Sequence, residues 1–224
     1  MKSKKLVVLV ATLLSLTAGT SFAGEIKKFT AFNTITVEEI EKSLPAEPIC
    51  IGLDVDDTAL FSSPGFYYAF NNHDGENGEN IYGQKPLSNM QFWNDQSTKF
   101  DKLSMPKDSA KRIIEMHKKH GDKIFFITAR PEAPENEVLT DCLHRAFGLG
   151  DDQPKAIFTG YVSKAKFIKE NNVTIYYGDS DSDITEAWDA GIRAIRFMRS
   201  PLSTNKGKYN PGKYGEHVLE NSAD

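Results

Sequence analysis

The chain has 224 residues, of which 39% are hydrophobic and 26% are charged. This composition is ordinary for a globular protein, and it supplies enough apolar side chains for one domain with its own core. The formal net charge is −4, which argues against general binding to nucleic acid polymers or to anionic membrane surfaces.

The N-terminal segment has the features of a secretory signal peptide. Three lysines among the first five residues precede an apolar run from Leu6 to Leu16, and small residues flank Phe22. We therefore predict cleavage after Ala23, export of the protein, and a mature domain over residues 24–224. The apolar run is too short to span a bilayer, so an uncleaved membrane anchor is the weaker alternative.

The chain contains two cysteines, Cys50 and Cys142. In an exported protein they could form one disulfide, but their spacing does not resemble a disulfide framework. Because Cys50 lies in an apolar run, we favour a buried free thiol at that position.

The first predicted elements are a helix and a strand. Thr36 and Glu39 have capping-box spacing, which predicts a short helix that starts near residue 36. The apolar run PICIGLD, residues 48–54, predicts a buried strand. Residues 61–104 are irregular, although PLSNMQFWNDQSTKF is compatible with a helix. Since an insertion of this length is usually functional, we expect a small, mainly helical cap.

From residue 106 onward, helical and strand-like segments alternate. The predicted helices cover residues 106–121, 134–147, 163–172 and 183–191, and the predicted strands cover 123–128, 155–158, 174–179 and 193–198. This alternation predicts an α/β fold with a Rossmann-like parallel sheet and helices on both faces. The tail, about residues 199–224, is expected to be loop or hairpin.

Polar side chains stand where the predicted strands end or a following helix begins. They are Asp54, Asp56, Thr128, Lys164, Asp179 and Asp183. Ligands of open parallel sheets bind beyond the carboxyl ends of the strands, so these side chains are expected to converge.

The chemistry of this set indicates phosphoryl transfer. Four clustered carboxylates would repel one another with one lysine as counter-charge, and Mg²⁺ suits a site made of a few carboxylates, a phosphate and waters. A carboxylate can also attack phosphorus as a nucleophile. A metal, a lysine and a hydroxyl donor are the groups expected to neutralise the phosphoryl oxygens.

The order of these motifs resembles that of the haloacid dehalogenase superfamily. The motifs read DVDDT, FFITAR, GYVSKAKF and GDSDSD, and they match over about residues 48–198. The longer stretches DVDDTALFSSPGF, IFFITAR and IYYGDSDSDIT, behind a signal peptide, are similar to those of the class B acid phosphatases, non-specific enzymes of the bacterial periplasm. The likeness extends into PLSNMQFW and YGEHVLENSAD, and so covers nearly the whole mature chain.

The resemblance implies roles for the four acids. Asp54 would be the nucleophile and a metal ligand. Asp56 would donate and accept the proton, and would contact the metal through its backbone carbonyl. Asp179 would be a direct metal ligand, whereas Asp183 would hold a metal-bound water.

It also implies a phosphate-binding group of Thr128, the Ala129 amide and Lys164. Ala129 stands where the family usually has glycine, which leaves less room for the phosphate. Arg130 would either assist there or serve as a structural ion-pair partner, and both alternatives remain open. Asp57 and Asp181 are expected to cap local turns.

Three apolar residues of the insertion, Phe66, Leu87 and Trp93, could line a pocket for a nucleoside or aryl leaving group. Alternatively, they form the core of the small cap, and an aromatic side chain can do both. Tyr209 in the tail is a further candidate for the substrate pocket.

By resemblance, the protein is expected to be a periplasmic homotetramer with one Mg²⁺ per subunit. It would hydrolyse small phosphomonoesters, such as nucleotides and aryl phosphates, and would also transfer phosphate to alcohols. One alternative is a narrower 5′-nucleotidase of the class C type, but this chain has DVDDT in place of DxDET and no lipoprotein cysteine. The other is a non-catalytic storage or phosphate-binding protein, which the presence of both Asp54 and Asp56 disfavours.

Overall fold

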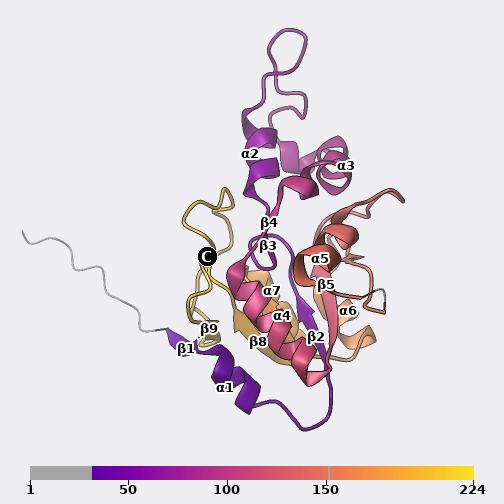
Figure 1. Cartoon of the computed structure of the whole chain (residues 1–224). Helices are drawn as coiled ribbons and strands as arrows, with labels where there is room; N and C mark the ends of the chain where they lie inside the picture. The colour runs from indigo at the N-terminus through magenta and orange to yellow at the C-terminus, as the bar shows by residue number, and fades with distance from the viewer. Residues whose placement is uncertain (1–31, 151) are drawn as a thin grey trace, which may run out of the picture. The chain divides into compact units, whose positions relative to one another are not determined.

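The computed structural model describes residues 32–150 and 152–224, so the predicted signal peptide lies outside the described residues. Seven strands form one sheet: β1 (Asn33–Ile35), β2 (Cys50–Leu53), β5 (Lys123–Thr128), β6 (Ile157–Phe158), β7 (Val173–Gly178), β8 (Arg193–Arg196) and β9 (His217–Leu219). Their order is β1-β9-β8-β7-β2-β5-β6, and every neighbouring pair is parallel (Figure 1). The predicted α/β fold with a parallel sheet is confirmed.

Strand β2 sets the position of the site within this sheet. It pairs with β5 on one side and β7 on the other, so the chain winds outward from it in both directions. In open parallel sheets, the crevice beyond such a switch point binds ligands. The carboxyl end of β2 is therefore where chemistry is expected.

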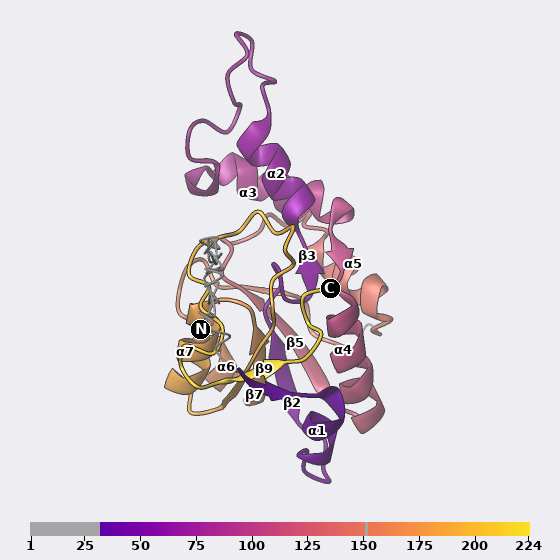
Figure 2. The same ribbon diagram turned by 90° about the vertical axis from the view of Figure 1, so that its left-hand side faces the viewer.

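Helices cover the sheet on both faces (Figure 2). Ile40 of α1 (Val37–Lys42), Ile113 of α4 (Asp108–His120) and Leu143 of α5 (Leu139–Phe147) belong to the larger buried cluster, with Leu53 of β2. The helices α6 (Lys164–Glu170) and α7 (Asp181–Asp189) pack on the other face through the second cluster, in which Ile184 is fully buried. The capping box predicted at Thr36 and the N-cap predicted at Ser163 are both present.

Three predictions of local structure were wrong: the starts of two helices and the structure of the tail. Pro106 does not start α4, because it belongs to β4 (Met105–Pro106), which pairs antiparallel with β3 (Leu60–Phe61). Helix α5 begins at Leu139 rather than at residue 134, since Pro134 lies in an irregular connection whose turn is closed by a hydrogen bond from Glu137 N to Pro134 O. The tail is more than loop or hairpin: its segment His217–Leu219 enters the sheet between β1 and β8.

The β3–β4 ribbon stands at the base of the inserted segment. Between its strands lie α2 (Ser63–Asn71), the 3₁₀ turns η1 (Pro86–Ser88) and η2 (Phe100–Leu103), and α3 (Met90–Thr98) (Figure 1). The helix predicted within PLSNMQFWNDQSTKF is confirmed as α3. The segment has its own small buried cluster of Ala69, Tyr82 and Phe92.

Cys50 and Cys142 are both free and partly exposed. Cys50 is therefore an unpaired thiol, as favoured, although it is only half-buried. In the part of the chain that the structure describes, no helix is long and apolar enough to span a membrane.

Candidate active site

Asp54 lies at the carboxyl end of β2, at the centre of the sheet. Its backbone N–H donates to Tyr177 O at 2.9 Å, which extends the pairing of β2 with β7 by one residue. Asp54 is buried, and its side chain is 10% exposed. The fully buried Thr58 hydroxyl lies 3.4 Å from Asp54 Oδ2 and 3.0 Å from Asp179 Oδ1. The turn after β2 therefore binds to the end of β7 directly through side chains.

Two further acids come from the junction of β7 and α7. Asp179 directly follows the strand, and Asp183 forms a capping box with Ser180, whose backbone N–H donates to Asp183 Oδ2 at 2.9 Å. A Cβ at Gly178 would collide with the Asp183 side chain, so glycine is required just before Asp179. The helix start thus folds Asp183 back toward the strand end.

Lys164 reaches this cluster from the start of α6. Its Nζ donates to Asp54 Oδ1 at 2.5 Å and to Asp183 Oδ1 at 2.7 Å, and its side chain is buried. Burial alone would lower the pKa of Lys164, but the two carboxylates raise it well above its usual value. Lys164 therefore stays charged and partly neutralises the acids.

Asp54, Asp179 and Asp183 fit a divalent metal. One carboxylate oxygen from each lies within 4.8 Å of the others, and all three residues are buried. Burial raises the pKa of Asp54 well above its usual value; Lys164 opposes this effect, and the neighbouring acids add to it. Burial and the nearby Asp183 likewise raise the pKa of Asp179. A hard cation with oxygen ligands would relieve this cost, as expected for an all-carboxylate donor set.

Asp56 is held apart from that cluster by Arg130. Arg130 Nε donates to Asp56 Oδ2 at 2.9 Å and one of its terminal nitrogens donates to Oδ1 at 2.7 Å. The same guanidinium binds the buried Asp101 of η2 at 2.7 and 3.0 Å, and Gln96 donates to Asp101 Oδ1 at 2.7 Å. Burial opposes ionisation of Asp56, but Arg130 outweighs it and lowers the pKa of that carboxyl. Of the two alternatives for Arg130, the structure shows the ion pair, and it places that pair on Asp56.

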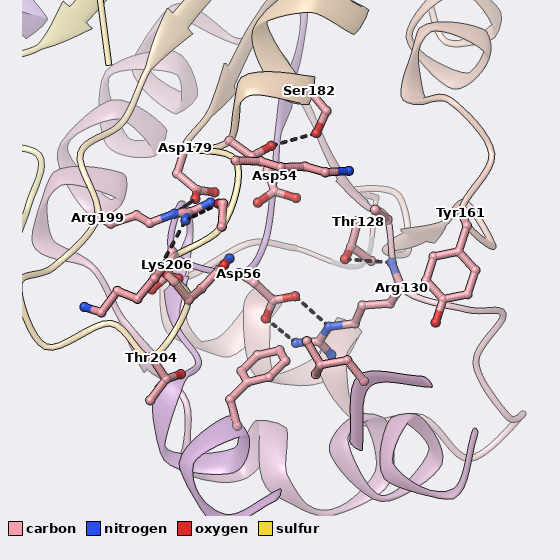
Figure 3. Close-up of a pocket in the computed structure, with 18 of the residues that line it drawn as sticks. Asp54, Asp56, Thr128, Arg130, Tyr161, Asp179, Ser182, Arg199, Thr204 and Lys206 are labelled. Atoms are coloured by element: carbon pink, nitrogen blue, oxygen red, sulfur yellow. Dashed lines mark hydrogen bonds and ion pairs between the residues drawn. The ribbon is translucent and has the colours of Figure 1, made fainter. Parts of the chain in front are cut away.

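A cavity of about 580 Å³ opens above these acids (Figure 3). Thr128 and Ala129 at the end of β5 line it with Asp54, Asp56 and Lys164. The predicted set is therefore brought together, although Asp183 binds Lys164 and does not itself line the cavity.

The apolar residues of the inserted segment also reach the cavity. Phe66, Leu87 and Trp93 all line it. Phe66 and Trp93 pack against the buried cluster of the segment as well, with ring centroids 5.8 Å apart. These two aromatics therefore belong to the core of the segment and line the cavity as well, whereas Leu87 is 43% exposed and belongs to the wall alone.

Three residues of the site were not predicted from the sequence: Arg199, Asp101 and Tyr161. Arg199 forms a buried ion pair with Asp179, so the acids have two arginines besides Lys164 as counter-charges, not one lysine alone. Its position shortly after β8, beyond Phe197 and Met198, was the only available signal. Asp101 lies far from the motifs in sequence. Tyr161 lines the cavity at 62% exposure with a backbone φ of 66°, and no pattern in the sequence indicates it.

Tyr209 does not have the place suggested for it. Its hydroxyl accepts from the Arg199 backbone N–H at 3.0 Å, and its ring lies 4.7 Å from the Arg199 guanidinium carbon. Tyr209 therefore contacts Arg199 from outside the cavity, and it is not one of the described residues that line the cavity wall. The expectation that Asp57 and Asp181 cap local turns was wrong: their side chains accept from Ser203 and Asn210, 146 and 29 residues away, and so bind the tail to the site.

Comparison with known proteins identifies the family. Residues 16–204 match the model of the HAD superfamily, subfamily IIIB (acid phosphatase). The chain is 41% identical over 195 residues to the class B acid phosphatase of Edwardsiella ictaluri (strain 93-146), covering 84% of this chain and 78% of that protein. The class B acid phosphatase of Haemophilus parainfluenzae (strain T3T1) is 41% identical, with 84% and 80% covered.

The chain belongs to the class B acid phosphatases. Among solved structures, a CbbY variant from Rhodobacter sphaeroides superimposes with a TM-score of 0.52 at 13% identity, covering 78% of this chain and 95% of that one. At this identity, the likeness shows the HAD-like fold alone. The match favours class B over the narrower class C alternative, and membership in a phosphatase family argues against a storage protein.

Proposed function

We propose that this class B acid phosphatase hydrolyses organic phosphomonoesters, including nucleotides and aryl phosphates, through an aspartyl-phosphate intermediate. The observation that carries the proposal is the position of Asp54. It lies at the floor of the cavity, within reach of Asp179 and Asp183, with its carboxylate held by Lys164. A carboxylate so placed is a suitable nucleophile for phosphorus.

The reaction divides between two carboxylates. Asp54 attacks phosphorus and forms an acyl phosphate, while the bond to the leaving oxygen breaks and Asp56 donates a proton to that oxygen, a proton that it must first take up against the effect of Arg130 on its pKa. Asp56, now a carboxylate, accepts a proton from water, which attacks the phosphoenzyme and releases inorganic phosphate and Asp54. An alcohol that takes the place of this water yields a new phosphate ester, which is the phosphotransferase reaction.

The cavity walls supply the remaining functions. Thr128, the Ala129 amide and the Lys164 ammonium are the proposed ligands of the phosphate oxygens, because all three line the cavity beside Asp54. Residues 61–104 are the proposed cap, and Phe66, Leu87 and Trp93 present an apolar wall to an aromatic leaving group.

One Mg²⁺ per subunit is the proposed cofactor, held by Asp54, Asp179 and the Asp56 backbone carbonyl, with Asp183 acting through water. When bound, it neutralises charge on the phosphoryl oxygens. Three of the four acids, Asp54, Asp56 and Asp179, line the cavity that an incoming phosphate dianion enters, which makes this neutralisation necessary.

Chelation is therefore expected to abolish hydrolysis, and added Mg²⁺ is expected to restore it. The measurement is phosphate release from nucleotides, aryl phosphates and sugar phosphates, each with Mg²⁺ and with excess chelator. Activity on aryl phosphates and nucleotides that disappears with chelator supports both the substrate class and the metal. Full activity in excess chelator would contradict the metal assignment, and hydrolysis of one 5′-nucleotide alone would favour the narrow nucleotidase.

The protein is proposed to be exported to the periplasm through cleavage after Ala23. The mature chain is expected to begin at Gly24 and to be recovered in the periplasmic fraction, because Lys2, Lys4 and Lys5 precede a short apolar run. N-terminal sequencing checks the cleavage. Retained Met1, or recovery in the membrane pellet, would show that the segment is an anchor.

A homotetramer is the proposed assembly, by resemblance to the family. Light scattering at micromolar concentration is expected to give four times the mass of the mature chain. A monomeric mass across that concentration range would rule out the tetramer as the working form.

A further inference from the structure

The segment after β8 brings two lysines without acidic partners to the cavity wall. Arg130, Lys164 and Arg199 also line the cavity, and each is paired with a buried or partly buried acid. Lys206 and Lys208 line it too, yet within residues 32–150 and 152–224 neither ammonium forms an ion pair. The cavity wall therefore carries two lysines that form no ion pair among the described residues, although the net charge of the chain is negative.

The backbone around these lysines is held in place from within the site. Arg199 donates to Asn205 O at 3.1 Å and to Gly207 O at 2.8 Å, on either side of Lys206. The Asp181 N–H donates to Lys208 O at 2.9 Å, and Lys208 adopts a positive φ of 48°. That conformation is unfavourable for a residue with a side chain, and the surrounding hydrogen bonds maintain it.

Lys206 also lies on a different wall from Thr128, one of the proposed phosphate-binding residues. Figure 3 shows Lys206 beside Arg199 and Thr204, with Asp56 between this group and Thr128. An ester whose reacting phosphate lies at Asp54 would extend into a cavity of about 580 Å³, which is room for a ligand of nucleotide size. A second anionic group on that ester could reach the lysines while the first phosphate stays at Asp54.

We propose that Lys206 and Lys208 form a subsite for a second anionic group of the substrate. The enzyme then prefers bisphosphorylated compounds, such as nucleoside bisphosphates, over the corresponding monophosphates. This inference rests on the proposed phosphomonoesterase function of the same cavity. Both ammonium groups are exposed to solvent, so each contact contributes modestly and weakens with added salt.

The test compares adenosine 3′,5′-bisphosphate with adenosine 5′-phosphate in the Mg²⁺-loaded enzyme. The ratio of kcat/KM for the bisphosphate over the monophosphate is expected to be about two- to twenty-fold at low ionic strength, as two exposed ion pairs allow. The ratio should fall toward one in Lys206→Met/Lys208→Met and in 0.5 M salt, since about 0.5 M salt screens exposed charges within a few ångströms. The matched control is Lys42→Met/Lys169→Met, which makes the same change in net charge on exposed lysines outside the cavity and should keep the wild-type ratio.

Two results would overturn the subsite: a wild-type ratio near one at low salt, or a wild-type ratio that survives in Lys206→Met/Lys208→Met. An equal fall in the control variant would also overturn it, because the preference would then come from net charge. If neither ester is hydrolysed, the proposed function has failed, and calorimetric Kd values for the two esters then decide the inference by the same ratio.

Discussion

Asp54→Asn is expected to abolish turnover, by at least about 10⁴-fold, and to leave no covalent phosphoenzyme. An amide cannot replace the carboxylate that attacks phosphorus. Asp56→Asn should behave differently. It should still form phosphoenzyme from an aryl phosphate, whose leaving group needs little protonation, but should hydrolyse that intermediate slowly. The loss of general acid–base help typically costs about 10² to 10⁴ in rate.

Rapid quench with a labelled aryl phosphate measures both steps. The phosphoenzyme should accumulate in Asp56→Asn and be absent in Asp54→Asn. Because Asp54 is also a proposed metal ligand, calorimetric titration with Mg²⁺ must accompany the experiment. Equal absence of the intermediate in both variants, with metal binding intact, would contradict the proposed division between nucleophile and acid.

The second large effect is expected at Arg130. Arg130 is 2% exposed, and its guanidinium makes four hydrogen bonds, two to Asp56 and two to Asp101. Arg130→Met would leave these two carboxylates facing each other without a counter-charge. Removing one partner of a buried ion pair costs about 3–5 kcal/mol of unfolding free energy. Urea denaturation of the variant and the wild type measures the difference.

Arg130→Lys separates charge from geometry. The lysine keeps the positive charge, but one ammonium cannot make the paired contacts to two carboxylates that a guanidinium makes. Asp56 should then be poorly oriented, so kcat should fall more for alkyl phosphates, whose leaving oxygen requires a proton, than for aryl phosphates. Arg112→Lys is the control, because its ion pair with Asp224 is exposed and 3.7 Å long.

An unchanged alkyl-to-aryl ratio of kcat in Arg130→Lys would show that Arg130 supplies charge without positioning Asp56. A wild-type unfolding free energy in Arg130→Met would show that the two carboxylates find other partners. Either result is distinct from a general loss of folding, which circular dichroism of each variant detects.

The sequence by itself determined the fold class and the floor of the site. Local patterns carry that information: alternating apolar strands and amphipathic helices predict a parallel sheet, and strand ends meet at one edge of such a sheet. Asp54, Thr128 and Asp179 each directly end or follow a strand, so their meeting depends only on strand order. Lys164 and Asp183 stand at helix starts, where Ser163 and Ser180 mark the first turn.

Only the tertiary structure decided the partners of the acids and the walls of the cavity. Asp101 meets Arg130, and Arg199 meets Asp179, across 29 and 20 residues of chain, and ion pairs between connections leave no local pattern. The same holds for the tail strand β9, whose three residues are stabilised by pairing with β1 and β8 rather than by their own propensity. The position of Lys206 likewise follows from the hydrogen bonds of Arg199 to the neighbouring carbonyls. These contacts depend on long-range packing, because residues of different connections meet only when the sheet and its helices bring those connections together.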